Sequence, residues 1–284
     1  MKKLICVLTA LVMALSLAAC GRGEDLPETT GEETVPGLLM PELPKPVAPI
    51  GEPVILRFYE TRTEGCDADT GNIPVLTVTS SIPRAFLPAY PRAGEHISNV
   101  FSQLQEELGQ GDDTVPGFSD LLDQARASRK ELGENFQPYY RGLSTYVTRA
   151  DPEVLSLVAD QQNYLGGAHG FDRHQGFAFD PRTGDRLTLE DLTPDPEAFR
   201  AAVLEQMVLL SQQEPLSLQL PWLEGDPEAA FLSLLVPGSW YLSDEALVIF
   251  GQEEQFGPHA AGIPAFPIPY EALQEVMVPP AALS

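Results

Sequence analysis

Two of the four histidines in this chain lie in one glycine-rich stretch, NYLGGAHGFDRHQ, which runs from Asn163 to Gln175. His169, Asp172 and His174 are close together in sequence, and His259 could join them in the fold. Imidazole and carboxylate groups suit zinc. Their spacing across a glycine-rich turn, however, is no recognised ligand pattern. We therefore keep His169, Asp172 and His174 as candidate metal ligands, but expect neither a bound metal nor a cofactor.

The same stretch can also be interpreted as a structural turn. Gly166, Gly167 and Gly170 allow positive φ angles or close backbone approach, which other residues resist. His169 could then use its ring nitrogens to hold the backbone groups of the loop together. No partner base or nucleophile can be recognised nearby, so we favour the turn over a catalytic loop.

Familiar hydrolase motifs are missing from the sequence. There is no G-x-S-x-G, no S-x-x-K with its partner motifs and no H-E-x-x-H. Cys66 has no cysteine-protease signature around it. With 41 Asp and Glu residues, a pair of carboxylates in the sequence says nothing about glycoside hydrolysis, which depends on their separation in space. We expect a protein that is not an enzyme; the alternative is a cell-wall hydrolase or metal-dependent enzyme using His169 and His174.

A second glycine-rich stretch, EQFGPHAAGIPAFPIPYEAL, follows an expected strand. Glycine and proline here predict a surface loop, and loops of this kind often carry binding residues. Phe256, Pro258 and His259 are our candidates for contact with a partner. The alternative is a buried connection into the last strand.

The chain begins MKKLICVLTALVMALSLAACG. Two lysines, a short apolar run and Leu-Ala-Ala-Cys are typical of a bacterial lipoprotein signal, and the run is shorter than the roughly 20 residues of a spanning helix. We expect a signal peptide over residues 1–20, a lipid on Cys20 and an extracytoplasmic protein held to the membrane by that lipid. Cys66 would then be the remaining cysteine, so no internal disulfide is expected.

Acidic residues dominate the charge. The formal net charge is −24 at pH 7. This excludes nucleic acid as an expected ligand, since Lys and Arg drive that binding, and it favours cationic partners by long-range attraction. The alternative is that the acidity serves solubility alone. Residues 21–52 are rich in proline and acids, which predicts a disordered, extended tether.

The remaining sequence mixes strand and helix patterns without regular alternation, so we predict an α+β fold made of two adjoining small modules in which mixed sheets pack with helices. We place the modules at residues 53–170 and 171–284. The expected strands and strand hairpins cover residues 53–60, 73–81, 138–150, 153–165, 175–192 and 239–251. The expected helices lie over residues 94–110, from Phe118 to Ala125 and over 195–213, with a shorter one from Asp226 and a strand leading into a final helix over 265–277.

These motifs resemble a pair of adjoining modules of unknown function found in extracytoplasmic regions of bacterial proteins. The first ends in Tyr-x-Gly-Gly-Ala-His. The second carries Phe-Asp-x-x-Thr-Gly, Leu-x-Asp-Leu and Ile-Pro-Tyr-x-x-Leu. The matching positions here are Tyr164 and 166–169 in the first module, and Phe179, Asp180, Thr183, Gly184, Leu189, Asp191, Leu192, 268–270 and Leu273 in the second.

Such modules occur in RsiV-type anti-sigma factors, which bind lysozyme outside the cell, and ahead of the catalytic domain of some peptidoglycan deacetylases. The resemblance implies a lipid-tethered binding or sensing module for a cationic, lysozyme-like envelope protein. His259 stands where those modules usually have tyrosine. We expect neither control of a sigma factor nor deacetylation here. A further alternative is a wall-polymer binder that uses Trp222 and Trp240 as stacking surfaces.

Overall fold

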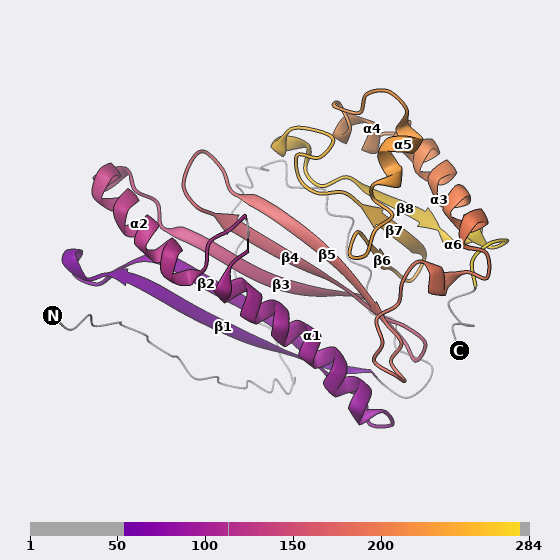
Figure 1. Cartoon of the computed structure of the whole chain (residues 1–284), viewed down its shortest axis with the longest axis horizontal. Coiled ribbons are helices and arrows are strands. Elements are labelled where there is room, and N and C mark those ends of the chain that lie inside the picture. Colours follow the sequence, from indigo (N-terminus) through magenta and orange to yellow (C-terminus); the bar gives the residue numbers. More distant parts are fainter. Residues whose placement is uncertain (1–53, 113, 279–284) are drawn as a thin grey trace, which may run out of the picture.

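The computed structural model describes residues 54–112 and 114–278. The expected signal peptide, the expected lipidation site at Cys20 and the expected tether lie outside these residues. The described chain forms two sheets packed with helices, which is the α+β architecture predicted from the sequence (Figure 1).

The larger sheet has five strands in the order β1-β2-β3-β4-β5 in the described part of the chain. Strands β2 and β3 are parallel, and the other neighbouring pairs are antiparallel. A parallel pair needs a long crossover connection; here two helices, α1 and α2, supply it. The elements of this module are β1 (Ile55–Asp67), η1 (Ala68–Thr70), β2 (Ile73–Phe86), α1 (Pro91–Gln110), α2 (Phe118–Leu132), η2 (Gly133–Asn135), β3 (Tyr139–Ala150), β4 (Leu155–Tyr164) and β5 (Phe171–Phe179).

Helices α1 and α2 cover one face of this sheet (Figure 1). The apolar positions of α1 fall on one side of the helix and are buried, with Phe101 at its centre. The Phe101 ring lies 5.1 Å from that of Phe177 and 6.0 Å from that of Phe179, both on β5. Side chains two apart in a strand share a face, so the odd-numbered residues of β5 point toward α1.

The second module is a three-stranded antiparallel sheet, β6-β7-β8, with helices packed against it. Helix α3 begins as the sequence predicts, because the Asp195 carboxylate accepts a hydrogen bond from the Ala198 N–H. The elements are η3 (Glu190–Leu192), α3 (Pro196–Ser211), α4 (Leu216–Gln219), α5 (Pro227–Leu232), β6 (Trp240–Leu242), β7 (Ala246–Phe250), η4 (His259–Ala261), β8 (Ala265–Pro269) and α6 (Tyr270–Leu273).

The even-numbered residues of β5 face the second module, and the two modules meet there at close range. The Gly176 N–H donates to the Gly238 carbonyl at 2.7 Å. A Cβ on Gly176 would lie 1.8 Å from the Trp240 carbonyl oxygen, so glycine alone allows this approach. Ser156, which is fully buried on β4, donates to the Phe177 carbonyl and accepts from the Leu242 N–H.

Two details differ from the sequence predictions. The expected boundary between residues 170 and 171 lies inside the larger sheet, because β5 pairs with β4 along its whole length. The predicted hairpin over 175–192 has a strand only on its first side. Its return is a single bridge between Phe179 and Arg186, followed by a hydrogen bond from the Leu187 N–H to the Ala178 carbonyl.

None of the helices in residues 54–112 and 114–278 has the length and apolar character needed to cross a membrane.

Candidate functional site

The glycine-rich stretch around His169 connects β4 to β5. Gly166 and Gly167 have φ angles of +94° and +92°, which favour glycine. The Tyr164 hydroxyl donates to the Gly167 carbonyl at 3.1 Å. A Cβ on Gly170 would lie 2.5 Å from the Asn163 carbonyl oxygen. The loop is thus a tight turn in which the side chains of Tyr164 and His169 contact the loop backbone, and the His169 side chain is exposed on it.

The two glycine-rich stretches, which are far apart in sequence, touch through their histidines. The rings of His169 and His259 are stacked, with centroids 4.1 Å apart and planes 18° apart. His259 Nδ1 lies 2.7 Å from Glu253 Oε1, and Glu253 Oε2 accepts from the Asp172 N–H at 2.9 Å. Glu253 therefore connects the loop after β7 to the edge of β5 by a side-chain hydrogen bond. We call the paired segments 166–169 and 258–260 the composite loop surface.

His174 has a separate set of partners. It lies opposite Asp160 in the sheet, with His174 Nε2 3.2 Å from Asp160 Oδ1, and both side chains are largely buried. The Gln252 side chain continues the sheet at this edge. It accepts from the His174 N–H at 3.1 Å and donates to the His174 carbonyl at 2.9 Å. His174 thus helps to join the two modules.

The candidate metal ligands are divided between these two sets. His169 contacts His259, whereas His174 contacts Asp160. Asp172 offers its backbone N–H to Glu253. Within the described residues, no three His, Cys, Asp or Glu side chains are grouped so that they could hold a metal ion.

Asp172 has the most shifted carboxyl group of the region. Its pKa is raised from 3.8 to about 6, mainly by burial and also by the neighbouring carboxylates Asp160 and Glu253, while His174 and His259 act in the opposite direction. The carboxylate is therefore ionised at neutral pH at a free-energy cost, and it gains a proton in mild acid.

The three candidate partner-contact residues differ in exposure. Pro258 is exposed, and the His259 side chain is 39% exposed. Phe256 is a correction to the sequence prediction: it is buried in the core of the second module, edge-on to Phe231 at 6.0 Å between ring centroids. A large apolar side chain gains more from that core than from solvent, so Phe256 is not at the surface, whereas Pro258 and His259 are accessible there.

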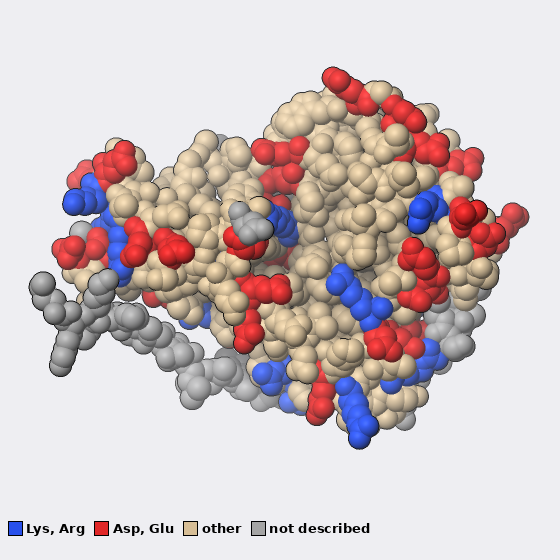
Figure 2. All heavy atoms as spheres, in the orientation of Figure 1, with Lys and Arg blue, Asp and Glu red and all other residues tan. Residues whose placement is uncertain are grey.

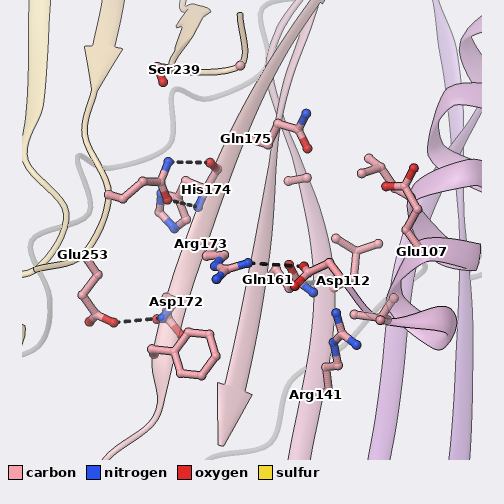
Figure 3. A pocket seen from close by; sticks show the side chains of 18 of the residues that line it. Glu107, Asp112, Arg141, Gln161, Asp172, Arg173, His174, Gln175, Ser239 and Glu253 are labelled. Carbon is pink, nitrogen blue, oxygen red and sulfur yellow. Dashed lines mark hydrogen bonds and ion pairs between the residues drawn. The ribbon is translucent and has the colours of Figure 1, made fainter. Parts of the chain in front are cut away.

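A cavity of about 640 Å³ opens next to the composite loop surface, on the face of the sheet that carries α1. The floor consists of side chains from β3, β4 and β5, and the walls come from the end of α1 and from two loops of the second module. Figure 3 shows Arg141, Arg173, Asp112 and Glu107 around this space, with Glu253 on the opposite side. Its charged and polar lining residues are Glu107, Asp112, Arg141, Gln161, Asp172, Arg173, His174, Gln175, Ser239, Gln252, Glu253 and Glu254.

Two arginines lie on the floor of the cavity. Arg141 is 1% exposed, and burial lowers the pKa of its guanidinium. Arg173 lies over the Phe171 ring, and its Nη1 is 3.3 Å from Asp112 Oδ2. Asp112 is also held by the turn that follows it. The Thr114 hydroxyl hydrogen bond is the main cause that lowers the pKa of Asp112 to about 2.

Sequence reasoning did not select this cavity. Arg141 carried the one available signal, because it is a charge inside the otherwise apolar and aromatic strand YYRGLSTYV. A buried charge requires partners, but strand periodicity says nothing about where they come from. Gln161 is twenty residues away on β4, and Pro116 lies in the connection between α1 and α2.

The other candidate residues named from the sequence, a cysteine and two tryptophans, lie outside this cavity. Cys66 is half-buried near the end of β1, and its carbonyl accepts from the Arg126 guanidinium at 2.7 Å. Trp240 belongs to the core of the second module at 4% exposure, whereas Trp222 is 53% exposed.

Comparison with family models gives a match, which lies within the second module. Residues 190–271 match the family model DUF3298, described as a protein of unknown function. This match lies inside the stretch whose motifs carry the resemblance given above. No curated protein matches the chain.

Two solved structures of DUF3298 family members have a similar fold. One, from Bacteroides fragilis, superposes with a TM-score of 0.60 at 15% sequence identity, covering 81% of this chain and 97% of its own. The other, from Pseudomonas aeruginosa, has a TM-score of 0.51 at 16% identity, covering 80% of this chain and 96% of its own. At these identities the likeness shows the fold alone. The fold of the described chain is therefore shared with these structures, while the binding or sensing role that the resemblance implies stays a prediction.

Proposed function

We propose that this protein is a lipid-anchored, extracytoplasmic binding module that captures a cationic envelope protein, with a lysozyme-like enzyme as the expected kind of partner. The observation that carries the proposal is the exposed composite loop surface beside a cavity whose mouth bears carboxylates. Segments 166–169 and 258–260 come from different modules and touch through stacked histidines. Such a surface recognises by shape and charge and needs no reactive group.

Charge supports a cationic partner. Five carboxylates and two guanidiniums line the cavity. One guanidinium is 1% exposed and the other is paired with Asp112, so the charge offered to an approaching protein is negative. Figure 2 shows acidic side chains over both modules around the hollow between them. Charges arranged in this way raise the rate of encounter with a partner of opposite sign and lose that effect in salt.

The anchoring part of the proposal rests on the amino-terminal sequence. A lipid on Cys20 would hold the chain at the membrane, and residues 21–52 would give the folded modules reach from the surface. Metabolic labelling with a palmitate analogue tests this part directly. The label is expected in the native chain and lost in Cys20→Ala; a Cys20→Ala chain that stays labelled and membrane-bound would contradict it.

Binding to a basic lysozyme tests the capture step. The full chain, purified in detergent, is immobilised and titrated with lysozyme at low and at physiological salt. We expect saturable binding whose affinity falls several-fold between the two conditions, because rim charges are screened over about 8–10 Å. Charge reversal by Glu107→Lys at the mouth of the cavity should weaken binding by about three- to tenfold, as expected for loss and inversion of one exposed charge pair.

Glu95→Lys is the matched control for Glu107→Lys. Both glutamates are exposed on α1, and the same change in net charge is made about 18 Å away along the helix, at 1.5 Å per residue. We expect Glu95→Lys to bind almost as well as the native chain. Equal weakening by both variants would show that only net charge matters, and absence of any salt-sensitive binding would refute the capture of cationic wall enzymes.

A further inference from the structure

The floor of the cavity holds a buried positive charge that lacks an anionic partner. Arg141 is 1% exposed and lines the cavity. Its Nη1 donates to the Pro116 carbonyl at 3.3 Å. With the Gln161 amide oriented so that its oxygen faces the guanidinium, that oxygen accepts from Nε at 3.2 Å and from Nη2 at 2.8 Å. These partners are neutral.

A guanidinium has five N–H donors in a planar fork. In Arg141, three of these N–H donors bond to Gln161 and Pro116. One N–H on Nη1 and one on Nη2 remain. Among the described residues, no carboxylate oxygen lies within 4.0 Å of a guanidinium nitrogen of Arg141, which is the limit for an ion pair. Burying a charge is costly unless it is both hydrogen-bonded and paired. The arrangement holds Arg141 in position and leaves two of its N–H donors without a partner among the described residues.

Arg173 adds a second cation on the same floor. It comes from β5, and its Nη1 lies 3.3 Å from Asp112 Oδ2, a carboxylate whose charge also acts on Arg141. The other oxygen of Asp112 accepts hydrogen bonds from the backbone N–H groups of Thr114 and Val115. One carboxylate therefore faces two guanidiniums in this part of the cavity. Figure 3 shows Arg141, Arg173 and Asp112 on the same side of β5.

The mouth of the cavity has the opposite sign. Glu107 and Glu254 are exposed and line it. A ligand with negative charge alone would be repelled at this entrance, whereas one that also carries an ammonium group would be attracted. Leu104, Leu108 and Leu143 provide apolar wall between the two regions. A cavity of about 640 Å³ lies within the roughly 300–1,000 Å³ that is usual for small-molecule sites.

We propose that this cavity is a binding site for a small zwitterionic ligand, an amino acid or a short peptide, whose carboxylate lies against Arg141 and Arg173 and whose ammonium group lies toward Glu107 and Glu254. The proposal is independent of the capture of a cationic protein. A carboxylate between two guanidiniums makes charge-assisted hydrogen bonds, which are the strong ones in proteins. Arg141 is preorganised for this by Gln161, so little side-chain entropy is lost on binding.

Calorimetric titration of the full chain with the dipeptide lysyl-alanine tests the proposal. We expect binding with a dissociation constant of about 1 mM or lower. The C-terminal amide of the same dipeptide should bind at least about tenfold more weakly, because it lacks the carboxylate. The form acetylated on both amines should bind about threefold more weakly, because its ammonium groups are gone. Inorganic phosphate is titrated in parallel.

Arg173→Gln should lose about tenfold in affinity for lysyl-alanine, since one of the two charged donors is removed. Arg62→Gln is the matched control, because Arg62 is an exposed arginine on β1 that does not line the cavity. Arg141→Gln should abolish binding if it folds; if it does not fold, Arg173→Gln decides.

Four outcomes would overturn the proposal: no heat with lysyl-alanine up to 10 mM, equal affinity for the dipeptide and its amide, equal affinity in Arg173→Gln and Arg62→Gln, or phosphate binding as tightly as the dipeptide. The last would show a simple anion site. Failure of lysozyme binding would leave these titrations unaffected, so the two proposals can fail separately.

Discussion

The contact between the two modules depends on the absence of a side chain at Gly176. In the Gly176→Ala variant the new Cβ would lie 1.8 Å from the Trp240 carbonyl oxygen and 2.6 Å from its carbonyl carbon. Real Cβ atoms essentially never approach closer than 3.0 Å, so the strands must separate by more than an ångström. Both partners are backbone, and no rotamer change can relieve the clash.

The expected cost follows from three terms. Overpacking of this kind costs about 1–3 kcal/mol. Separation also stretches the 2.7 Å hydrogen bond from the Gly176 N–H to the Gly238 carbonyl, which adds about 1 kcal/mol. The lower entropy of the unfolded alanine chain offsets about 0.4–1 kcal/mol. We therefore expect the free energy of unfolding to fall by about 2 kcal/mol.

Urea denaturation of the full chain measures this change, and hydrogen exchange locates it. Faster exchange is expected in β6 and at the edge of β5, with α1 less affected. Gly109→Ala is the matched control, because Gly109 lies in α1 with no atom within 4 Å of the added Cβ, and it should stabilise the protein by about 0.5 kcal/mol. If the urea midpoint of Gly176→Ala equals or exceeds that of the native chain, the close approach of β5 and β6 is not as described.

Two further substitutions test the same junction and the neighbouring carboxyl group. Ser156→Ala removes the acceptor of the Leu242 N–H from a fully buried site and should lower the free energy of unfolding by about 1–3 kcal/mol; an unchanged urea midpoint would contradict this bridging role. Asp172→Asn tests a carboxyl whose folded pKa, about 6, exceeds its ordinary value of 3.8, so that its ionisation weakens the fold as pH rises through this window. The variant should match the native stability below about pH 4 and exceed it above about pH 6, by about 1 kcal/mol after allowance for solvent screening at this half-buried position, and a pH-independent difference would refute the assignment.

Much of the secondary structure could be predicted from the sequence, because it depends on local signals. The Asp195 cap and the following apolar positions predict α3, and the structure confirms it. The turn at Ser243–Glu245 between two apolar runs predicts the β6–β7 hairpin, which is also confirmed. These features depend on neighbours within a few residues, which the sequence displays directly.

The sequence predicted less well which sheet each strand joins. Phe177 and Phe179 alternate with small residues and predict a strand, but the pattern does not say which sheet that strand joins. The structure pairs β5 with β4, and this places the strand in the first module. The predicted return strand after residue 185 is reduced to one bridge, at Arg186.

What the sequence alone determined is the α+β character, most of the elements, the acidity and the two glycine-rich turns. Tertiary structure decided that His169 stacks on His259, ninety positions away, that Phe256 is buried, and that Arg141 meets Arg173 and Asp112 in one cavity. The physical reason is that propensity, capping and periodicity act within a few residues, whereas contacts between strands and modules depend on how the whole chain packs. A site assembled from such contacts is visible only in the folded protein.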